Sequence, residues 1–159
     1  MKKIVLIIFF IVLILFLQIG ILPHFKVLGI FPNLILLSLI SLILINGFKK
    51  TAIWWAIVAG LFLDFYSLFN IVGISVVFLL LTSYFAHIGS QNLFKKTNFL
   101  SLIIIFILTI CFYYSLNLIF KSIFSRELQF YPLSFFTYLI YNLIFAIPVF
   151  YPIKEFYES

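Results

Sequence analysis

Long apolar runs, broken by short polar or proline-containing stretches, make up almost the whole chain. Taken in order, these runs predict helices over residues 4–22, 33–48, 51–68, 72–88, 99–120 and 133–151. Pro23 and Pro32 interrupt helix continuity in the first break, and Pro132 marks the entry to the last run. Because about 20 apolar residues cross the hydrocarbon of a bilayer, the pattern predicts a single all-α domain of six transmembrane helices.

The third predicted helix is short for a complete crossing. From Thr51 to Asp64 it has 14 residues, about 21 Å at 1.5 Å per residue, against a hydrocarbon core of about 30 Å. Either the helix continues to Leu68, which places Asp64 within the membrane, or the bilayer is locally thinned around it. Both alternatives make this a non-standard span.

Small residues and one acid share a face of this third helix. Ala52, Ala56, Gly60 and Asp64 stand four residues apart and therefore form one stripe. Small side chains let another helix approach closely, and the same stripe aims the Asp64 carboxylate into the protein rather than into lipid. An ionisable group near membrane depth is a functional-site candidate. The alternative is that Asp64 marks the water-facing end of a short helix.

The other polar side chains of the apolar runs are expected at helix ends and helix contacts. Asn33 either caps the second helix or donates into the bundle. Asn142 lies near the middle of the last run and should face other helices. Gln18, Trp54 and Trp55 stand close to run ends, where amides and indoles reach the membrane interface.

Composition identifies lipid as the solvent of this chain. Hydrophobic residues make up 66% of it and charged residues only 9%, whereas a soluble domain carries about 25% charged residues. The chain is therefore an integral membrane protein. Its net charge of +6 does not indicate nucleic-acid binding, because the basic residues fall in short pairs between apolar runs. The single cysteine, Cys111, lies inside an apolar run and excludes an intrachain disulfide.

The distribution of basic residues predicts the orientation. With six spans, both termini share one side, and we expect an uncleaved first helix because no small-residue cleavage site follows it. Seven of the ten basic residues lie on the side of the termini: Lys2, Lys3, Lys49, Lys50, Lys95, Lys96 and Lys154. Three lie opposite, which predicts cytoplasmic termini. The mixed-charge stretch 121–129 is expected to form a short amphipathic surface segment.

The sequence offers little catalytic chemistry. It lacks a phosphate-binding glycine loop, a histidine pair at helical spacing, and a Ser/His/Asp set. His24 is expected in a solvated loop and His87 at the interface, since neither has a partner ligand nearby. We therefore expect neither an enzyme nor a metal or other cofactor, and a sparse polar interior is more typical of a scaffold than of a pump.

Two short motifs carry a resemblance to a known family. Residues 31–37 read FPNLILL, and residues 59–67 read AGLFLDFYS and are followed by Val72-Gly73. In order and spacing these resemble the bacterial rod shape-determining protein MreD family, which pairs a Pro-Asn helix start with a Gly-x-x-x-Asp helix and a later glycine. The matching positions are Pro32, Asn33, Gly60, Asp64 and Gly73, as candidates for structural or partner contacts.

This resemblance implies a non-enzymatic component of the cell-elongation machinery in the bacterial inner membrane. Implied partners are an MreC-like bitopic membrane protein, MreB filaments, and two peptidoglycan synthases, a SEDS glycosyltransferase and a class B penicillin-binding protein. The helical fold is also similar to the substrate-binding subunits of energy-coupling-factor vitamin transporters. A small-molecule-binding subunit is therefore the alternative, with candidate ligand residues His24, Asn33, Asp64, Tyr66 and Asn70. A flippase for lipid-linked precursors would need a charged cavity that this sequence barely provides.

Overall fold

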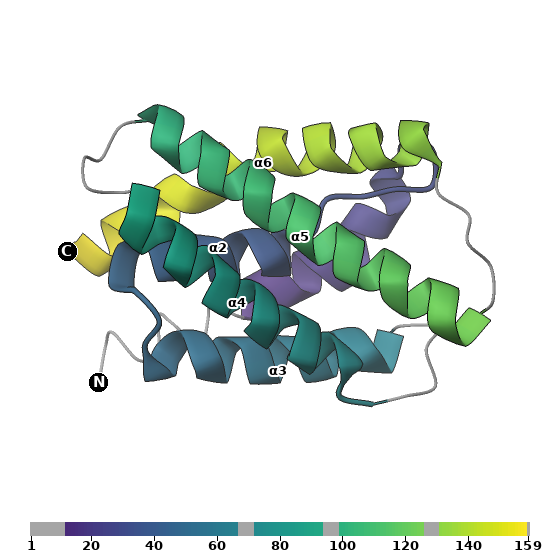
Figure 1. Cartoon of the computed structure of the whole chain (residues 1–159), viewed down its shortest axis with the longest axis horizontal. Coiled ribbons are helices and arrows are strands. Elements are labelled where there is room, and N and C mark those ends of the chain that lie inside the picture. Colours follow the sequence, from purple (N-terminus) through teal and green to yellow (C-terminus); the bar gives the residue numbers. More distant parts are fainter. Residues whose placement is uncertain (1–11, 67–71, 94–98, 126–130, 159) are drawn as a thin grey trace.

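The computed structural model describes residues 12–66, 72–93, 99–125 and 131–158, and these form a bundle of helices (Figure 1). Helical turns begin at Val12, pass into a π-helical segment η1 and end in a 3-10 turn η2. The elements are η1 (Leu17–Ile21), η2 (Leu22–Phe25), α2 (Leu34–Asn46), α3 (Lys50–Tyr66), α4 (Ile74–Leu93), α5 (Phe99–Ser125) and α6 (Pro132–Glu158). Within the described ranges, the one β-type pairing is the isolated bridge between Val27 and Ile30.

Helix α2 forms the centre of the bundle. It contacts α3, α4, α5 and α6, and Figure 1 shows it between α3 on one side and α6 on the other. Nine of its 13 residues are buried, because it is apolar on every face. At 1.5 Å per residue the helix is about 20 Å long, so it does not reach across a hydrocarbon core of about 30 Å.

A tight turn joins the first helical segment to α2. Val27 and Ile30 exchange backbone hydrogen bonds of 2.8 and 2.9 Å, and the two residues between them, Leu28 and Gly29, have φ angles of 53° and 78°. Positive φ at both central positions is the conformation of a type I′ turn. The Tyr141 hydroxyl donates to the Phe25 carbonyl at 2.9 Å and so ties this connection to α6.

Three helices are longer than the sequence predicted. Helix α4 continues to Leu93, so the first part of the polar stretch around Gln91 is helical. Helix α5 continues through Lys121 to Ser125, which corrects the expectation of a separate amphipathic segment beginning at Lys121. A single lysine extends its charge toward water from a helix end and does not stop the helix.

Helix α6 also runs further than expected, from Pro132 to Glu158, with Pro148 and Pro152 inside it. Its C-terminal turns lie at an angle to its first turns in Figure 1. An interior proline removes one hydrogen bond and bends a helix, so the chain changes direction here and stays helical.

Of the helices in the described ranges, three are long and apolar enough to cross a membrane, over Ile74–Gln91, Phe99–Phe124 and Pro132–Tyr157. Shorter apolar helices cover Val12–Phe25 and Leu34–Asn46, and α3 has 17 residues. Large apolar side chains cover the outside of the bundle; Phe65, Leu100 and Leu133 are 76%, 71% and 67% exposed. Such a surface is suited to lipid. Six complete spans remain a prediction, and residues 4–11 of the first helix lie outside the described ranges.

Candidate functional site

The small-residue stripe of α3 faces the interior. Ala52, Ala56 and Asp64 are 1%, 0% and 6% exposed, and Gly60 is buried. The interpretation of Asp64 as a water-facing helix end is therefore wrong, although the residue does lie close to the end of α3. The stripe directs Asp64 toward α4, the helix with which α3 has its most extensive contact.

Gly60 lies where α3 and α4 are closest. A β-carbon at this position would be 2.6 Å from the Cα atom of Val76, 2.7 Å from its backbone nitrogen and 2.8 Å from its Cγ2 atom. Two of these atoms belong to the backbone and cannot move aside cheaply. A glycine is therefore required for the helices to approach this closely.

Four residues further along α3, Asp64 caps the N-terminus of α4. Its Oδ2 accepts a hydrogen bond from the Gly73 N–H at 2.6 Å, and its Oδ1 accepts from the Ser75 N–H at 2.9 Å. The first amides of a helix have no partner within the helix, and the positive end of the helix dipole attracts a carboxylate. Asp64 therefore provides acceptors for two N–H groups at the α4 N-terminus, and these hydrogen bonds in turn stabilise the buried carboxylate.

Gly73 explains why the cap comes from another helix. Its carbonyl accepts from the Val77 N–H at 3.1 Å, so Gly73 occupies the N-cap position of α4. It has no side chain with which to cap, and its φ of +101° favours glycine. Asp64 supplies the missing oxygen atoms from α3. We call Gly60, Asp64, Gly73, Ser75 and Val76 the α3–α4 junction.

A second set of polar residues caps the central helix. The Asn33 Oδ1 accepts from the Leu36 N–H at 3.0 Å, which confirms the first of the two alternatives for Asn33, a cap of this helix. Pro32, directly before it, is buried. The Asn33 N–H donates to the Asn142 Oδ1 at 2.8 Å, and the Leu34 N–H donates to the Gln18 Oε1 at 2.6 Å.

We call Gln18, Asn33 and Asn142 the α2 cap, since they come from three separate segments and meet at one helix end. Asn142 is fully buried and faces another helix, as expected from its position in the last apolar run. Gln18 is only 3% exposed, so its expected place at the membrane interface is wrong. Because water has little access to a buried helix end, each of these amide oxygens serves as the acceptor that water would provide at an exposed end.

The two tryptophans of α3 take different environments. Trp54 is 65% exposed, as expected for an interfacial indole, whereas Trp55 is 3% exposed. The Trp55 Nε1–H donates to the Ser38 Oγ at 2.9 Å, and the Ser38 hydroxyl donates to the Ile35 carbonyl at 2.8 Å. Trp55 therefore fastens α3 to α2, and its prediction as an interfacial residue is wrong.

The sequence-predicted site residues therefore fall into two groups. Gly60, Asp64 and Gly73 meet at the α3–α4 junction, and Pro32 and Asn33 belong to the α2 cap. The hydrogen bonds described above connect Asn33 and Asp64 to two different helix N-termini. Gln18 and Ser75 were missed, and Ser75 contributes only its backbone amide, for which a sequence carries no signal.

Among the residues proposed for ligand binding, the three whose side chains are described do not share a cavity. His24 is exposed, Asn33 and Asp64 hold helix ends, and Asn70 and the Tyr66 side chain lie outside the described part of the structure. A cavity of about 250 Å³ lies elsewhere, and none of these five residues is among its described lining. Within the described ranges, no three His, Cys, Asp or Glu side chains group as metal ligands.

His87 packs beside the connection between α2 and α3. Its ring centroid lies 5.9 Å from that of Phe48, and its Nε2 atom is 3.2 Å from the Gln91 Nε2. Among the described side chains its Nδ1 is buried without a hydrogen-bond partner. The structure thus places His87 in an aromatic contact between helices.

Comparison with known proteins gives the same family as the two sequence motifs. The family model described as rod shape-determining protein MreD matches residues 1–159, the whole chain. Searches of curated proteins and of solved structures each gave no significant match.

Proposed function

Because this chain belongs to the MreD family of rod shape-determining proteins, we propose that it is a non-enzymatic scaffold of the bacterial cell-elongation machinery. In this role it holds an MreC-like bitopic protein in the inner membrane. Through that complex it connects MreB filaments in the cytoplasm with the SEDS glycosyltransferase and class B penicillin-binding protein that build peptidoglycan outside.

The observation that carries the proposal is how the rare polar side chains are used. Asp64 holds the α4 N-terminus, and Gln18, Asn33 and Asn142 hold the α2 N-terminus. A catalyst or transporter subunit would direct several such groups into a common pocket. Here they fix the relative positions of helices. This use supports a protein that offers a rigid surface to other membrane proteins.

We infer the orientation from the basic residues. The excess of lysines beside the termini places the α2–α3 connection and the end of α6 at the cytoplasmic face. The α3–α4 junction and the α2 cap then lie toward the outer face. Fusing a reporter that fluoresces only in the cytoplasm to the C-terminus tests this orientation, and a dark but stably inserted fusion would contradict it.

Co-purification from membranes of the native host tests the scaffold. The tagged chain should bring down an MreC-like protein together with cell-wall synthases, identified by mass spectrometry. Recovery of an ATPase pair and its coupling subunit instead would overturn the proposal. It would favour the alternative that the chain is a small-molecule-binding subunit of a vitamin transporter and shares the fold of such subunits. Cells depleted of the protein should become round, and unchanged rod shape would also count against the scaffold.

A further inference from the structure

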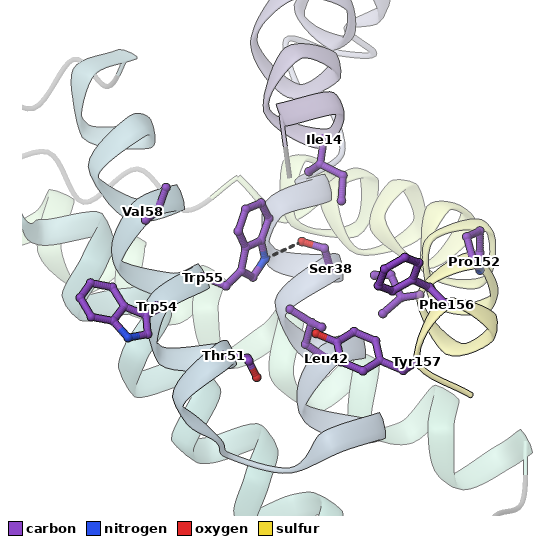
Figure 2. A pocket seen from close by; sticks show the side chains of 11 residues that line it. Ile14, Ser38, Leu42, Thr51, Trp54, Trp55, Val58, Pro152, Phe156 and Tyr157 are labelled. Carbon is purple, nitrogen blue, oxygen red and sulfur yellow. Dashed lines mark hydrogen bonds between the residues drawn. The ribbon is translucent and has the colours of Figure 1, made fainter. Parts of the chain in front are cut away.

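A lateral groove separates α3 from the C-terminal turns of α6. Helix α2 forms its floor through Ser38 and Leu42, and Ile14 closes one end (Figure 2). The cavity measures about 250 Å³. We call it the α3–α6 groove. It lies at the end of the bundle away from the α3–α4 junction and the α2 cap, so neither of these sites explains it.

The inner part of the groove is suited to hydrocarbon. Leu42, Val58, Ile153 and Phe156 are among the residues that line it. The hydroxyl of Ser38 already accepts from Trp55 and donates to the Ile35 carbonyl, as the dashed line in Figure 2 shows for the first of these bonds. A water molecule needs two to four polar partners, which this part of the groove does not offer. An apolar cavity of about 150 Å³ already accommodates benzene, so this larger one fits a length of acyl chain.

The mouth of the groove is polar and basic. Thr51 and Tyr157 lie there, and in Figure 2 the Tyr157 hydroxyl points from α6 toward α3. Thr51 also borders a second hollow, which Lys49 and Lys50 line. Both lysines are exposed, and the described residues that line the groove and the hollow include no acid. The positive charge of the two lysines is complementary to an anionic phosphate.

The groove runs from this mouth into the depth of the membrane. Val58 follows Thr51 by seven residues, about 10 Å along α3. A lipid has the same order, with its phosphate at the interface and its chain below.

We propose that the α3–α6 groove binds one acyl chain of an anionic phospholipid, with the phosphate held by Lys49, Lys50 and the Thr51 hydroxyl. The proposal goes beyond the scaffold function and does not depend on which proteins the scaffold holds. It adds a specific lipid to the structure of the bundle, at the contact between α3 and α6.

Tryptophan quenching by brominated lipids tests the site directly. The chain has two tryptophans, so Trp54→Phe leaves Trp55, which lines the groove, as the single fluorophore. The purified full chain is placed in phosphatidylcholine vesicles that contain a minority of dibrominated phosphatidylglycerol or of dibrominated phosphatidylcholine. Two lysines at the mouth should enrich the anionic lipid roughly 30-fold at the groove, so the phosphatidylglycerol should quench Trp55 at a much lower fraction.

Two matched variants separate headgroup binding from chain binding. In the Trp54→Phe background, Lys49→Gln with Lys50→Gln should abolish the preference for phosphatidylglycerol, whereas Lys121→Gln, also exposed, should leave it unchanged. Val58→Phe should reduce quenching by both lipids because the added ring occupies the groove. Val77→Phe, at a position on α4 that is 52% exposed, is its control.

Three results would overturn the proposal. Equal quenching by the two brominated lipids would exclude a headgroup-specific site, as would a preference that survives loss of both lysines. Weak quenching by both lipids would mean that a segment of this chain covers the groove. Because these measurements use the purified chain alone, their failure is distinguishable from a failure to co-purify cell-wall proteins.

Discussion

A β-carbon on Gly60 would lie 2.6 Å from the Cα atom of Val76, so α3 and α4 touch with no side chain between their backbones. Four residues away, the Asp64 carboxylate binds the amides that open α4. The close approach and the cap depend on each other, because the carboxylate of Asp64 is short and reaches the α4 amides only if the two helices are in contact. Gly60 and Asp64 therefore form one structural unit.

Gly60→Ala should destabilise the protein. The added methyl group meets the Val76 backbone, and overpacking of this kind costs about 1–3 kcal/mol, more than the helix propensity of about 1 kcal/mol that alanine adds. The thermal unfolding midpoint in detergent, followed by size-exclusion chromatography, measures the loss. Gly89→Ala is the matched control: nothing lies within 4 Å of a β-carbon there, so this variant should be at least as stable as the parent. Equal midpoints for both variants would show that the close approach is not required.

Asp64→Ala should cost more than Asp64→Asn. Alanine leaves the Gly73 and Ser75 amides without their acceptor, at about 1–3 kcal/mol for each. Asparagine keeps one acceptor oxygen and should retain part of the stability. Thermal midpoints and recovery of MreC-like partners are measured together, and the two should fall in parallel.

Ser75→Ala is the control for Asp64, because Ser75 contributes its backbone N–H and alanine keeps that group. It should leave stability and partner recovery unchanged. If Asp64→Ala lost the partner while its thermal midpoint stayed at the parental value, Asp64 would act at the partner surface and not through the α4 cap.

Gly73→Ala should destabilise α4 through the backbone. Its φ of +101° is rarely adopted by a residue with a β-carbon, and such a conformation costs about 1–3 kcal/mol. Gly20→Ala serves as control, since its β-carbon would make ordinary contacts with Phe16 at 3.6 Å. Hydrogen exchange of the first turn of α4 reports the effect locally. Unaltered protection there would argue against a strained N-cap.

Asn142→Leu should weaken the attachment of the α2 N-terminus to α6 and so destabilise the protein. The backbone N–H of Asn33 loses its acceptor inside the bundle, which costs about 1–3 kcal/mol. Thr137→Val on the same helix removes an exposed hydroxyl whose described hydrogen bond is to the Leu133 carbonyl of its own helix, so it should have little effect. Limited proteolysis and the thermal midpoint distinguish the two variants. An Asn142→Leu variant as stable as the parent would show that water or another group satisfies the α2 terminus.

The sequence predicted Gly60, Asp64 and Gly73 of the α3–α4 junction because an acid and glycines stand out in apolar runs. It could not predict how their partners are arranged. Asp64 binds backbone amides, which every residue carries, so no side chain reveals them. Trp54 and Trp55 are adjacent, and only the rotation of α3 about its axis decides that one faces lipid and the other Ser38.

The ends of elements were also hard to predict. Gln18 lies near the end of an apolar run, where an amide in water and an amide in the core look alike. The π-helical turn that contains it changes which side of the segment it faces, and the sequence shows no sign of that turn. Lys121 suggested the end of α5, but one charge near the membrane surface does not end a helix.

The α2 cap has a consequence for biosynthesis. Asn33 and Asn142 are 109 residues apart in the chain, and at about 5–20 residues per second the ribosome makes Asn142 roughly 5–20 s after Asn33. During that interval the central helix is already in the bilayer while the backbone N–H of Asn33 lacks its acceptor. The α2 cap therefore becomes complete only when α6 is inserted, and a truncated chain that lacks α6 exposes an incompletely capped α2 to membrane proteases.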